Sequence, residues 1–228
     1  MKYIYGCQEI PQFFSTYGSF IHGILARLYG GKISREEAYI EYLCEFGIHV
    51  IGFPPSEEIR KNFRNDGEAM FGRLPSVHRI IGIEKKLSFK IDGIPFIGFV
   101  DMIAEGEDGS IEIWDHKSHL LKPRSARKKR TKSDTELDEY LIQLYMYSIP
   151  VKRLLNQYPD RLVFHCYRSG SVIKEPFSMD KMKDAKKWAT DSVQEIRKCQ
   201  RFIPKPEYFK CRYLCGVSCQ CEYFSSSF

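Results

Sequence analysis

One stretch of the sequence decides the fold, Gly98–Lys117, which reads GFVDMIAEGEDGSIEIWDHK. Its first arm is apolar and β-branched, a turn segment with two glycines follows at 105–110, and a second arm alternates in polarity from Ile111. This pattern predicts a β-hairpin. Because side chains alternate between the two faces of a strand, Asp115 and Lys117 project from one face. If Asp101 on the facing arm points the same way, two carboxylates and a lysine converge at one end of the sheet.

The charges of this hairpin predict a metal site. Two buried carboxylates repel each other, and their pKa values rise unless a cation lies between them. Oxygen ligands of this kind suit Mg²⁺ or Mn²⁺. Lys117 can align a metal-bound water or stabilise the charge that grows on a phosphate under attack, so the predicted chemistry is phosphodiester hydrolysis. A charged strand end that only discourages aggregation is the competing interpretation.

The composition is that of a folded domain. A chain of 228 residues with 43% hydrophobic and 14% aromatic residues is long enough for one α/β domain, or a domain with a small appendage. The apolar runs fall short of the roughly 20 residues that a membrane span needs, so no membrane association is expected. The amino-terminal segment has no basic region followed by an apolar stretch, and no secretory signal is expected there.

The charge is mildly positive and unevenly distributed. The net charge of +6 permits a polyanionic partner without requiring one. Basic residues concentrate in the segment 118–135, which has no apolar periodicity and is long for a connection inside a domain. We expect this loop to be flexible without nucleic acid, and its charges to be solvated, to contact phosphates, or both. The expected DNA-binding residues are Arg124, Arg127, Lys128, Lys129 and Arg130.

Apolar periodicity predicts the remaining elements. Helices are expected at 17–29, 34–48, 54–73, 136–156 and 178–201, and further strands at 80–91 and 161–167. Ser34 and Glu37 form a capping box at the start of the second helix, and Ile91–Ile94 is expected to be a hairpin turn. His22 lies beside the apolar face of the first helix, where a lone histidine is usually structural. Glu84 in the strand 80–91 is expected at the surface rather than as a ligand. Gln143 and Tyr147 are four residues apart and share one helical face, although a tyrosine at this spacing is usually core. The last helix is expected to present these residues to the core: Met182, Ala185, Trp188, Ala189, Val193 and Ile196.

The carboxyl-terminal segment is rich in cysteine. Four thiols lie within eleven residues, after prolines that end the last helix, and this density predicts bound metal. They are Cys211, Cys215, Cys219 and Cys221. Zinc and an iron–sulfur cluster both use four thiolates, and the spacing alone does not separate them. Three cysteines outside this segment are interpreted as core or incidental thiols: Cys44, Cys166 and Cys199.

Taken together, the motifs resemble those of a known family. His22, Asp101, the Asp115–Lys117 triplet and the Gln143–Tyr147 segment occur in the order shown by the RecB-like branch of the PD-(D/E)XK nucleases. The chain resembles that branch, including the AddB nuclease domain and the CRISPR-adaptation exonucleases, and its compact form resembles phage or prophage members.

This resemblance implies both a fold and a division of the chain. The fold would be α/β, with a restriction-endonuclease-like core in which helices flank a central mixed β-sheet. Residues 1–203 would form the nuclease domain, with a helical insertion at about 34–75 and the flexible basic loop at about 118–135. Residues 204–228 would form a Cys-rich, metal-binding tail that packs on the same domain.

The resemblance also implies roles for individual residues. His22, Asp101, Asp115 and the main-chain carbonyl of His116 would bind Mg²⁺ or Mn²⁺, and Lys117 would orient or activate the attacking water. Gln143 and Tyr147 match the Gln-x-x-x-Tyr motif of the family, which helps to position the lysine and the DNA backbone.

Some members of this branch hold a [4Fe–4S] cluster with one cysteine before the motif histidine and three near the carboxyl end. By resemblance the ligands here are Cys7, Cys211, Cys215 and Cys221, with Cys219 as a spare or substitute. The sequence departs from the pattern because only 21 residues precede His22. Either Cys7 replaces the usual first ligand, or the cluster is absent, labile or replaced by Zn²⁺.

The function expected from the sequence is that of a metal-dependent DNA nuclease, an exonuclease rather than an endonuclease. Its substrate would be single-stranded DNA or DNA with free ends, in repair, recombination, replication or defence. It would act in the cytoplasm of a prokaryotic or phage-infected cell, as an oligomer or with recombination or replication partners. Two alternatives from other classes are a catalytically silent nucleic-acid-binding module and an adaptor that works through a zinc-bound tail.

Overall fold

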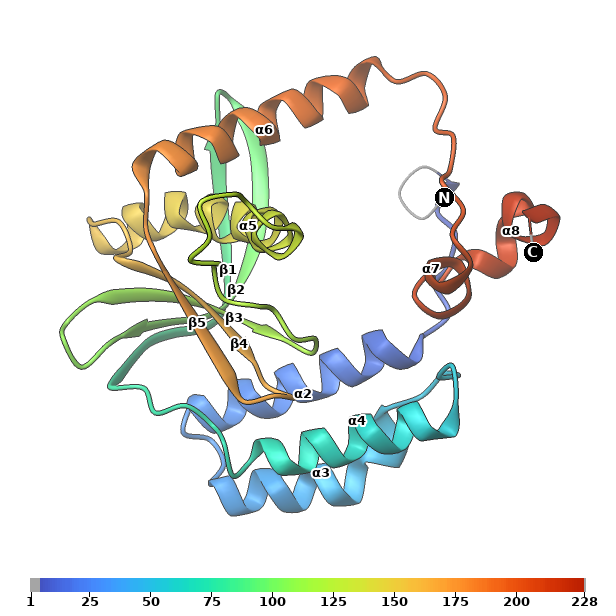
Figure 1. Ribbon diagram of the computed structural model, residues 1–228, viewed down its shortest axis with the longest axis horizontal. Helices are drawn as coiled ribbons and strands as arrows, with labels where there is room; N and C mark the ends of the chain where they lie inside the picture. The colour runs from blue at the N-terminus through green and yellow to red at the C-terminus, as the bar shows by residue number, and fades with distance from the viewer. Residues whose placement is uncertain (1–4, 228) are drawn as a thin grey trace.

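The computed structural model describes residues 5–227, and one mixed β-sheet organises them (Figure 1). Its five strands lie side by side in sequence order, and only β3 and β4 are parallel. The strands are β1 (Arg79–Ile91), β2 (Ile94–Glu105), β3 (Ile111–Lys117), β4 (Arg161–Cys166) and β5 (Ser171–Pro176). A parallel neighbour cannot be reached by a tight turn, and helix α5 (Lys132–Leu155) supplies the crossover from β3 to β4. The mixed sheet expected from the sequence is confirmed.

Turn chemistry fixes the two hairpins. The β1–β2 hairpin closes through Asp92 and Gly93, whose φ angles of 49° and 79° are those of a two-residue turn that follows the strand twist. The β2–β3 turn contains Gly109 at a φ of 77°. Both hairpins therefore form where the sequence predicts them.

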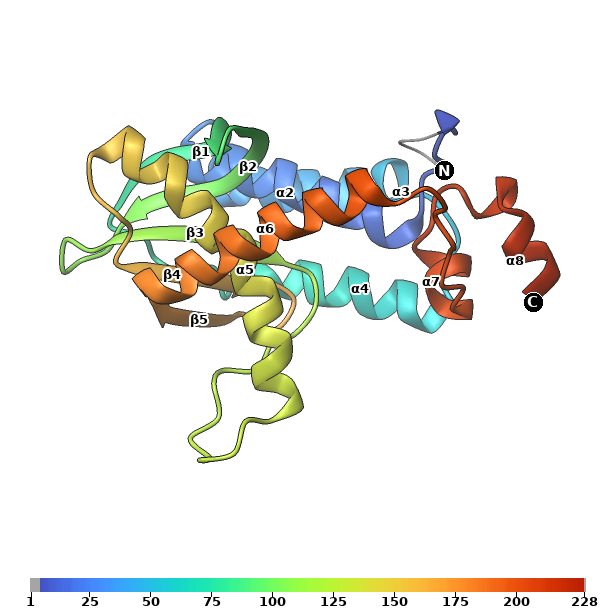
Figure 2. The same ribbon diagram turned by 90° about the horizontal axis from the view of Figure 1, so that it is seen from above.

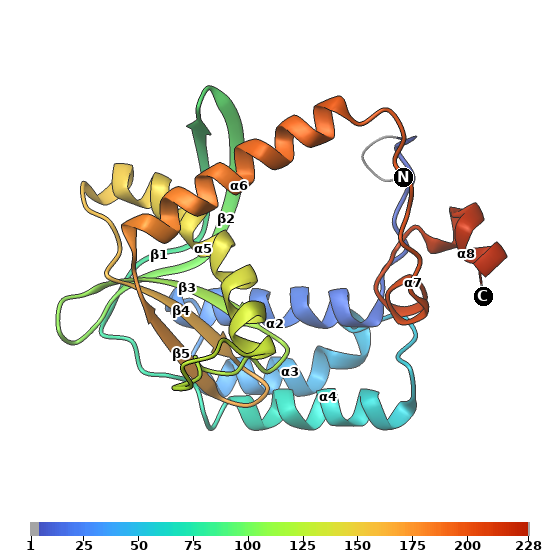
Figure 3. The ribbon, with the colours of Figure 1, turned by 45° about the horizontal axis from the view of Figure 1, so that its top comes forward.

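Helices cover both faces of the sheet (Figures 1 and 3). Helices α2 (Phe13–Tyr29), α3 (Arg35–His49) and α4 (Glu57–Met70) form a layer on one side, and α5 and α6 (Met179–Lys198) lie on the other. The alternation of side chains along the strands supplies both cores. Met102 and Trp114 belong to the cluster that reaches Tyr29 of α2, whereas Ile103 and Ile113 pack with residues of α5.

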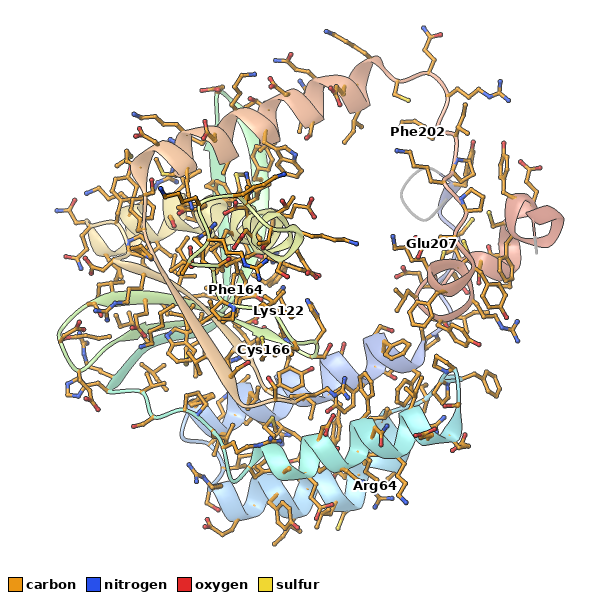
Figure 4. All side chains as sticks on the ribbon, in the orientation of Figure 1. Arg64, Lys122, Phe164, Cys166, Phe202 and Glu207 are labelled. Atoms are coloured by element: carbon orange, nitrogen blue, oxygen red, sulfur yellow. The ribbon has the colours of Figure 1, made fainter. Side chains whose placement is uncertain are left out.

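Helix α5 begins earlier than expected, at Lys132 rather than 136. Thr131 accepts a hydrogen bond from the Asp134 main chain, and the Asp134 carboxylate accepts one from the Thr131 N–H, which makes a capping box. The loop before this helix therefore covers 118–131 and extends away from the body of the molecule (Figure 2). Its start is held by the Leu121 N–H, which donates to Cys166 Sγ at 3.4 Å. Figure 4 labels Cys166 and Lys122, the residue after Leu121.

The second half of the chain differs from the expectations at two places. Strand β5 was not expected, because its six residues include a lysine and a glutamate and show no clear alternation. In α6, Met182, Ala185 and Ala189 are buried, but Trp188 is 55% and Ile196 is 60% exposed. Beyond Thr190 the helix runs on past the sheet (Figure 1), so Ile196 has no core to face, whereas Trp188 lies in the wall of a groove.

The Cys-rich tail returns to the beginning of the chain. It consists of α7 (Tyr208–Tyr213), the short 3₁₀ helix η1 (Ser218–Gln220) and α8 (Glu222–Ser227). The connection from α6, marked by Phe202 and Glu207 in Figure 4, carries the chain away from the sheet. The Ile10 N–H then donates to the Gly216 carbonyl at 2.7 Å, and Gln220 Nε2 donates to the Gln8 carbonyl at 2.9 Å. Within residues 5–227, no helix combines the length and the apolar character that crossing a membrane requires.

Candidate catalytic metal centre

The two acids of the hairpin lie where its ladder ends. Backbone pairing between β2 and β3 runs from Glu105 with Ile111 to Met102 with Trp114. One residue further along, a side chain replaces the backbone as the acceptor: Asp101 Oδ2 accepts a hydrogen bond of 2.7 Å from the main-chain N–H of His116. The backbone ladder thus ends where Asp101 and Asp115 lie on neighbouring strands.

His22 reaches this end of the ladder from α2. Its Nδ1 lies 3.5 Å from Asp101 Oδ1, and its Nε2 lies 3.1 Å from the main-chain carbonyl oxygen of His116. The imidazole thus contacts an acid of β2 and the backbone of β3 at once. The structure brings together His22, Asp101 and the His116 carbonyl, three of the four groups expected to hold the metal.

Asp115, the fourth group, is buried and pairs with the lysine two residues on. Its Oδ2 lies 2.7 Å from Lys117 Nζ, but the angles are not those of a hydrogen bond, and no other donor reaches that oxygen within the described residues. Lys117 Nζ also lies 5.1 Å from the centre of the Tyr140 ring. Tyr140 was not expected at the site, although it precedes Gln143 by one helical turn.

The electrostatics of the four side chains are those of a site short of positive charge. Burial raises the pKa of Asp115, Lys117 only partly offsets this effect, and the charge of Asp101 raises the pKa further. Burial also acts to raise the pKa of Asp101, but the contacts with His22 and His116 outweigh it and the net shift is downward. For His22, burial lowers the pKa, but Asp101, Asp115 and Glu84 together raise it above its ordinary value.

These residues fit a divalent cation. The carboxylate of Asp101, an imidazole nitrogen of His22 and the main-chain carbonyl of His116 lie together, and the buried carboxylate of Asp115, whose Oδ2 has only Lys117 close to it, feels the charge of Asp101. These groups are hard oxygen ligands with one nitrogen. Such a set suits Mg²⁺ or Mn²⁺ better than soft metals. His22, Asp101, Asp115 and the His116 carbonyl would hold such a cation, which would supply the positive charge that the two carboxylates call for.

The His116 side chain points away from the cation site into the core. Its ring stacks on Tyr29 at 6.0 Å, and its Nδ1 lies 3.1 Å from His165 Nδ1. Burial lowers the pKa of His116 to about 3 and that of His165 to about 4. Both rings are therefore neutral at neutral pH, and only the carbonyl of His116 is directed to the site.

Gln143 and Tyr147 share one face of α5, as expected. Gln143 Nε2 donates a hydrogen bond of 2.8 Å to Tyr147 Oη. Burial raises the pKa of Tyr147, as do the charges of Asp115 and Asp101. The Tyr147 ring packs directly on the backbone of Gly98 in β2, where an added Cβ would lie 2.4 Å from Tyr147 Cε1. Gly98 thus allows the helix to approach the strand that carries Asp101.

Glu84 of β1 also lies at the site, although its position in the sequence predicts a surface residue rather than a ligand. The side chain is exposed, as expected. Nevertheless, His22, Glu84 and Asp101 each offer one ligand atom, and these atoms lie within 4.8 Å of one another. This is the only group of three or more His, Cys, Asp or Glu side chains with such spacing in residues 5–227. Sequence alone could not find it, because the proximity depends on how β1 pairs with β2.

The five basic residues expected to bind DNA fall into two groups. Arg124 forms ion pairs with Asp138 and Glu175, both at 2.8 Å, and Arg130 also pairs with Asp138. Arg127, Lys128 and Lys129 are exposed and form no ion pair among the described residues. The second group is available to phosphates, whereas the first anchors the loop to α5 and β5.

The four expected cluster ligands lie at the junction of the tail and the first residues. Cys7, Cys211, Cys215 and Cys221 are free and half-buried, whereas Cys219 is exposed. The backbone bonds between the segments 8–10 and 216–220 bring Cys7 to the same region as the tail. Of the three cysteines interpreted as core or incidental, Cys166 is buried, and Cys44 and Cys199 are exposed.

The sheet presents acids and a lysine at one end, beside a histidine from a helix, and such groups can hold a divalent cation for phosphodiester hydrolysis. The family model described as the PD-(D/E)XK nuclease superfamily matches residues 1–222, and the chain belongs to that superfamily. Such nucleases act on DNA and generally use divalent metals such as Mg²⁺.

Two solved structures are similar to this chain over most of its length. One is a protein of Eubacterium rectale for which an exonuclease activity has been suggested, with 10% identity and a TM-score of 0.43, over 92% of this chain and 83% of that chain. The other is the protein SSO0001, with 14% identity and a TM-score of 0.34, over 91% of this chain and 94% of that chain. No curated protein matches the sequence.

Proposed function

We propose that the chain is a Mg²⁺- or Mn²⁺-dependent deoxyribonuclease of the RecB-like branch that degrades DNA from a strand end. The observation that carries the proposal is the meeting of His22, Asp101 and the His116 carbonyl at the end of the β2–β3 ladder, next to the Asp115–Lys117 pair. The bound cation would polarise the scissile phosphate and lower the pKa of a water molecule.

The side chains of the site divide the remaining tasks. His22, Asp101, Asp115 and the His116 carbonyl hold the cation. Lys117, fixed between Asp115 and the Tyr140 ring, orients the water and balances charge on the phosphate. Gln143 and Tyr147 line the approach from α5, where they can contact the DNA backbone.

An apolar groove beside these two residues supports an unpaired strand end as the substrate. The groove encloses about 580 Å³ and includes Gln143 and Tyr147 in its wall. The rest of its lining comes from Phe89, Phe96, Ile97, Glu139, Ile142, Met146 and Trp188. Exposed aromatic and apolar side chains next to a phosphate site offer a surface on which unpaired bases stack, whatever their sequence.

The experiment that tests this function is a Mn²⁺-dependent digestion of end-labelled linear and circular DNA, single- and double-stranded. We expect linear single strands to shorten and circles to survive. The Asp115→Asn variant should lose cleavage by at least about 100-fold while retaining the fold and DNA binding. The exposed Glu195→Gln variant is the matched control. Cleavage by the Asp115→Asn protein at the wild-type rate would contradict the proposal.

A [4Fe–4S] cluster in the tail is a second part of the proposal. It is supported by the position of Cys7 near the tail and by the half-burial of all four expected ligands. We expect the purified protein to be brown, with about four iron atoms per chain. Cys221→Ser should lose the iron and Cys219→Ser should retain it. Zinc in place of iron would favour the adaptor-like alternative for the tail.

A further inference from the structure

Glu84 occupies an unusual position in β1. Its neighbours Ile83 and Lys85 pair with Met102 and Val100, so Glu84 lies across from Asp101. The register of the two strands shifts just before this point, between Ile80 and Gly82, which marks a bulge. This shift sets the register in which Glu84 lies across from Asp101, and the Glu84 carboxylate lies close to His22 and Asp101.

The backbone of Glu84 is strained. Its φ of 45° is in the left-handed region, which is unfavourable for a residue with a side chain. Two other non-glycine residues of the described chain share this feature, Asp92 in a two-residue turn and Asn156 at the end of α5. Those are places where this conformation is expected. Glu84 lies inside a strand, where neither explanation holds.

The spacing at Glu84 is close to that of a coordination shell. Ligand atoms on a cation of the size of Mg²⁺ or Mn²⁺ lie about 3–4.4 Å apart, given metal–oxygen distances near 2.1 Å. The ligand atoms of His22, Glu84 and Asp101 lie within 4.8 Å of one another. Side-chain movements that shorten these separations by at most about 1.8 Å would bring all three into contact with one ion.

The charge of the site also changes when Glu84 is included. Asp101, Asp115 and Lys117 together carry a net charge of −1 if His22 is neutral. Glu84 makes this −2, which one divalent cation neutralises. A buried or half-buried site favours such balance because uncompensated charge is costly there.

We propose that Glu84 is a further protein ligand of the catalytic cation, held toward it by the bulge in β1 and facing His22 and Asp101. The inference rests on the proposed function for the presence of a cation. It adds a ligand from a third strand and explains why strain is retained at a position that solvent can reach.

The test is the binding of Mn²⁺ itself, measured by calorimetry or by the electron paramagnetic resonance of the free ion. Glu84→Gln should weaken binding at least about tenfold, which corresponds to loss of one charged ligand at roughly 1.4 kcal/mol or more. Glu195→Gln, on an exposed turn of α6, is the control and should bind as wild type does.

A second variant separates a ligand from a merely structural residue. Glu84→Gly removes the carboxylate and also relieves the strained φ, so we expect weaker Mn²⁺ binding together with higher thermal stability of the metal-free protein. Opposite signs of these two effects support the proposal. If the wild-type protein cleaves DNA but Glu84→Gln binds Mn²⁺ within twofold of the wild-type affinity, this inference is wrong and the proposed function stands. Absence of both Mn²⁺ binding and cleavage in the wild type would overturn the proposed function with it.

Discussion

The main-chain N–H of His116 donates a 2.7 Å hydrogen bond to the carboxylate of Asp101, at the point where β2 and β3 cease to pair through their backbones. One side chain thus closes the hairpin and faces the cation site. Asp101 has a structural task and a chemical one, and substitutions can separate them.

Asp101→Asn and Asp101→Ala should differ in stability but not in activity. An amide oxygen can still accept from the His116 N–H, whereas alanine leaves this half-buried donor unsatisfied at a cost of about 1–3 kcal/mol. We expect both variants to lose cleavage by at least about 100-fold, because neither offers a charged ligand. Chemical unfolding compared with rates of DNA cleavage checks this. Equal stability of the two variants would show that the hydrogen bond contributes little.

Lys117→Met should abolish cleavage without removing the metal. The lysine contacts Asp115 and the Tyr140 ring and is no ligand, so its loss leaves the anionic ligands in place. We expect kcat to fall about 100-fold or more, with Mn²⁺ affinity unchanged or somewhat higher. Single-turnover cleavage and Mn²⁺ titration measure the two effects, and Lys183→Met on the exposed face of α6 serves as control. A loss of Mn²⁺ affinity equal to the loss of rate would argue for a role in metal binding.

Gly98→Ala should push α5 away from β2. The added Cβ would lie 2.4 Å from Tyr147 Cε1, so the ring must move and carry its hydrogen bond with Gln143 along. Overpacking of this kind costs about 1–3 kcal/mol. Gly47→Ala in α3 is the matched control, because a Cβ there meets nothing within 4 Å. We expect thermal melts and cleavage rates to fall for Gly98→Ala only; an active and stable variant would show that Tyr147 needs no fixed position.

Acid should destabilise the fold through the buried histidine pair. The pKa of His165 is about 4 in the folded chain because of burial, below the value near 6.5 expected when unfolded. Between these values the unfolded chain binds more protons, so stability falls as pH drops from about 6.5 toward 4. His165 contributes about 2 kcal/mol of this loss between pH 7.5 and 5. Urea unfolding at both pH values should show a smaller difference for His165→Gln; an unchanged difference would assign the effect to other groups.

Trp188 should report on the binding of unpaired DNA. Trp114 is buried in the sheet, whereas Trp188 is 55% exposed and lines the groove next to Gln143 and Tyr147. We expect a single-stranded oligonucleotide to quench the tryptophan emission of the Asp115→Asn protein, because a base stacks on the exposed indole. Trp188→Phe should lose the signal. Quenching of equal size by blunt duplex DNA would place the groove outside the path of the strand end.

Much of the fold is readable from the sequence because local chemistry agrees with it. The Asp92–Gly93 turn, the Ser34 capping box and the alternation of the second hairpin arm each specify one conformation. The sequence also carries a signal for the start of helix α5, the capping box of Thr131 and Asp134. This signal is obscured because it lies within the run of basic residues.

Other features depend on where elements end up in space. The apolar stripe of α6 predicts a buried face along its whole length, but only its first half meets the sheet, and Ile196 is exposed. The site shows the same division. The motif residues could be named from their order in the chain. The position of Glu84 depends on the pairing of β1 with β2 after a bulge, and the packing of Tyr147 of α5 depends on Gly98 of β2.

The imidazole of His22 links a helix of the outer layer to the strands of the sheet, through Asp101 and the His116 carbonyl. Any cation held there would join two parts of the molecule that separate when the chain unfolds. A ligand that binds only the folded chain raises the free energy of unfolding by about 2.7 kcal/mol at one hundred times its Kd. The melting temperature of this protein should therefore rise with added Mn²⁺, which makes a simple thermal shift a gauge of site occupancy that needs no substrate.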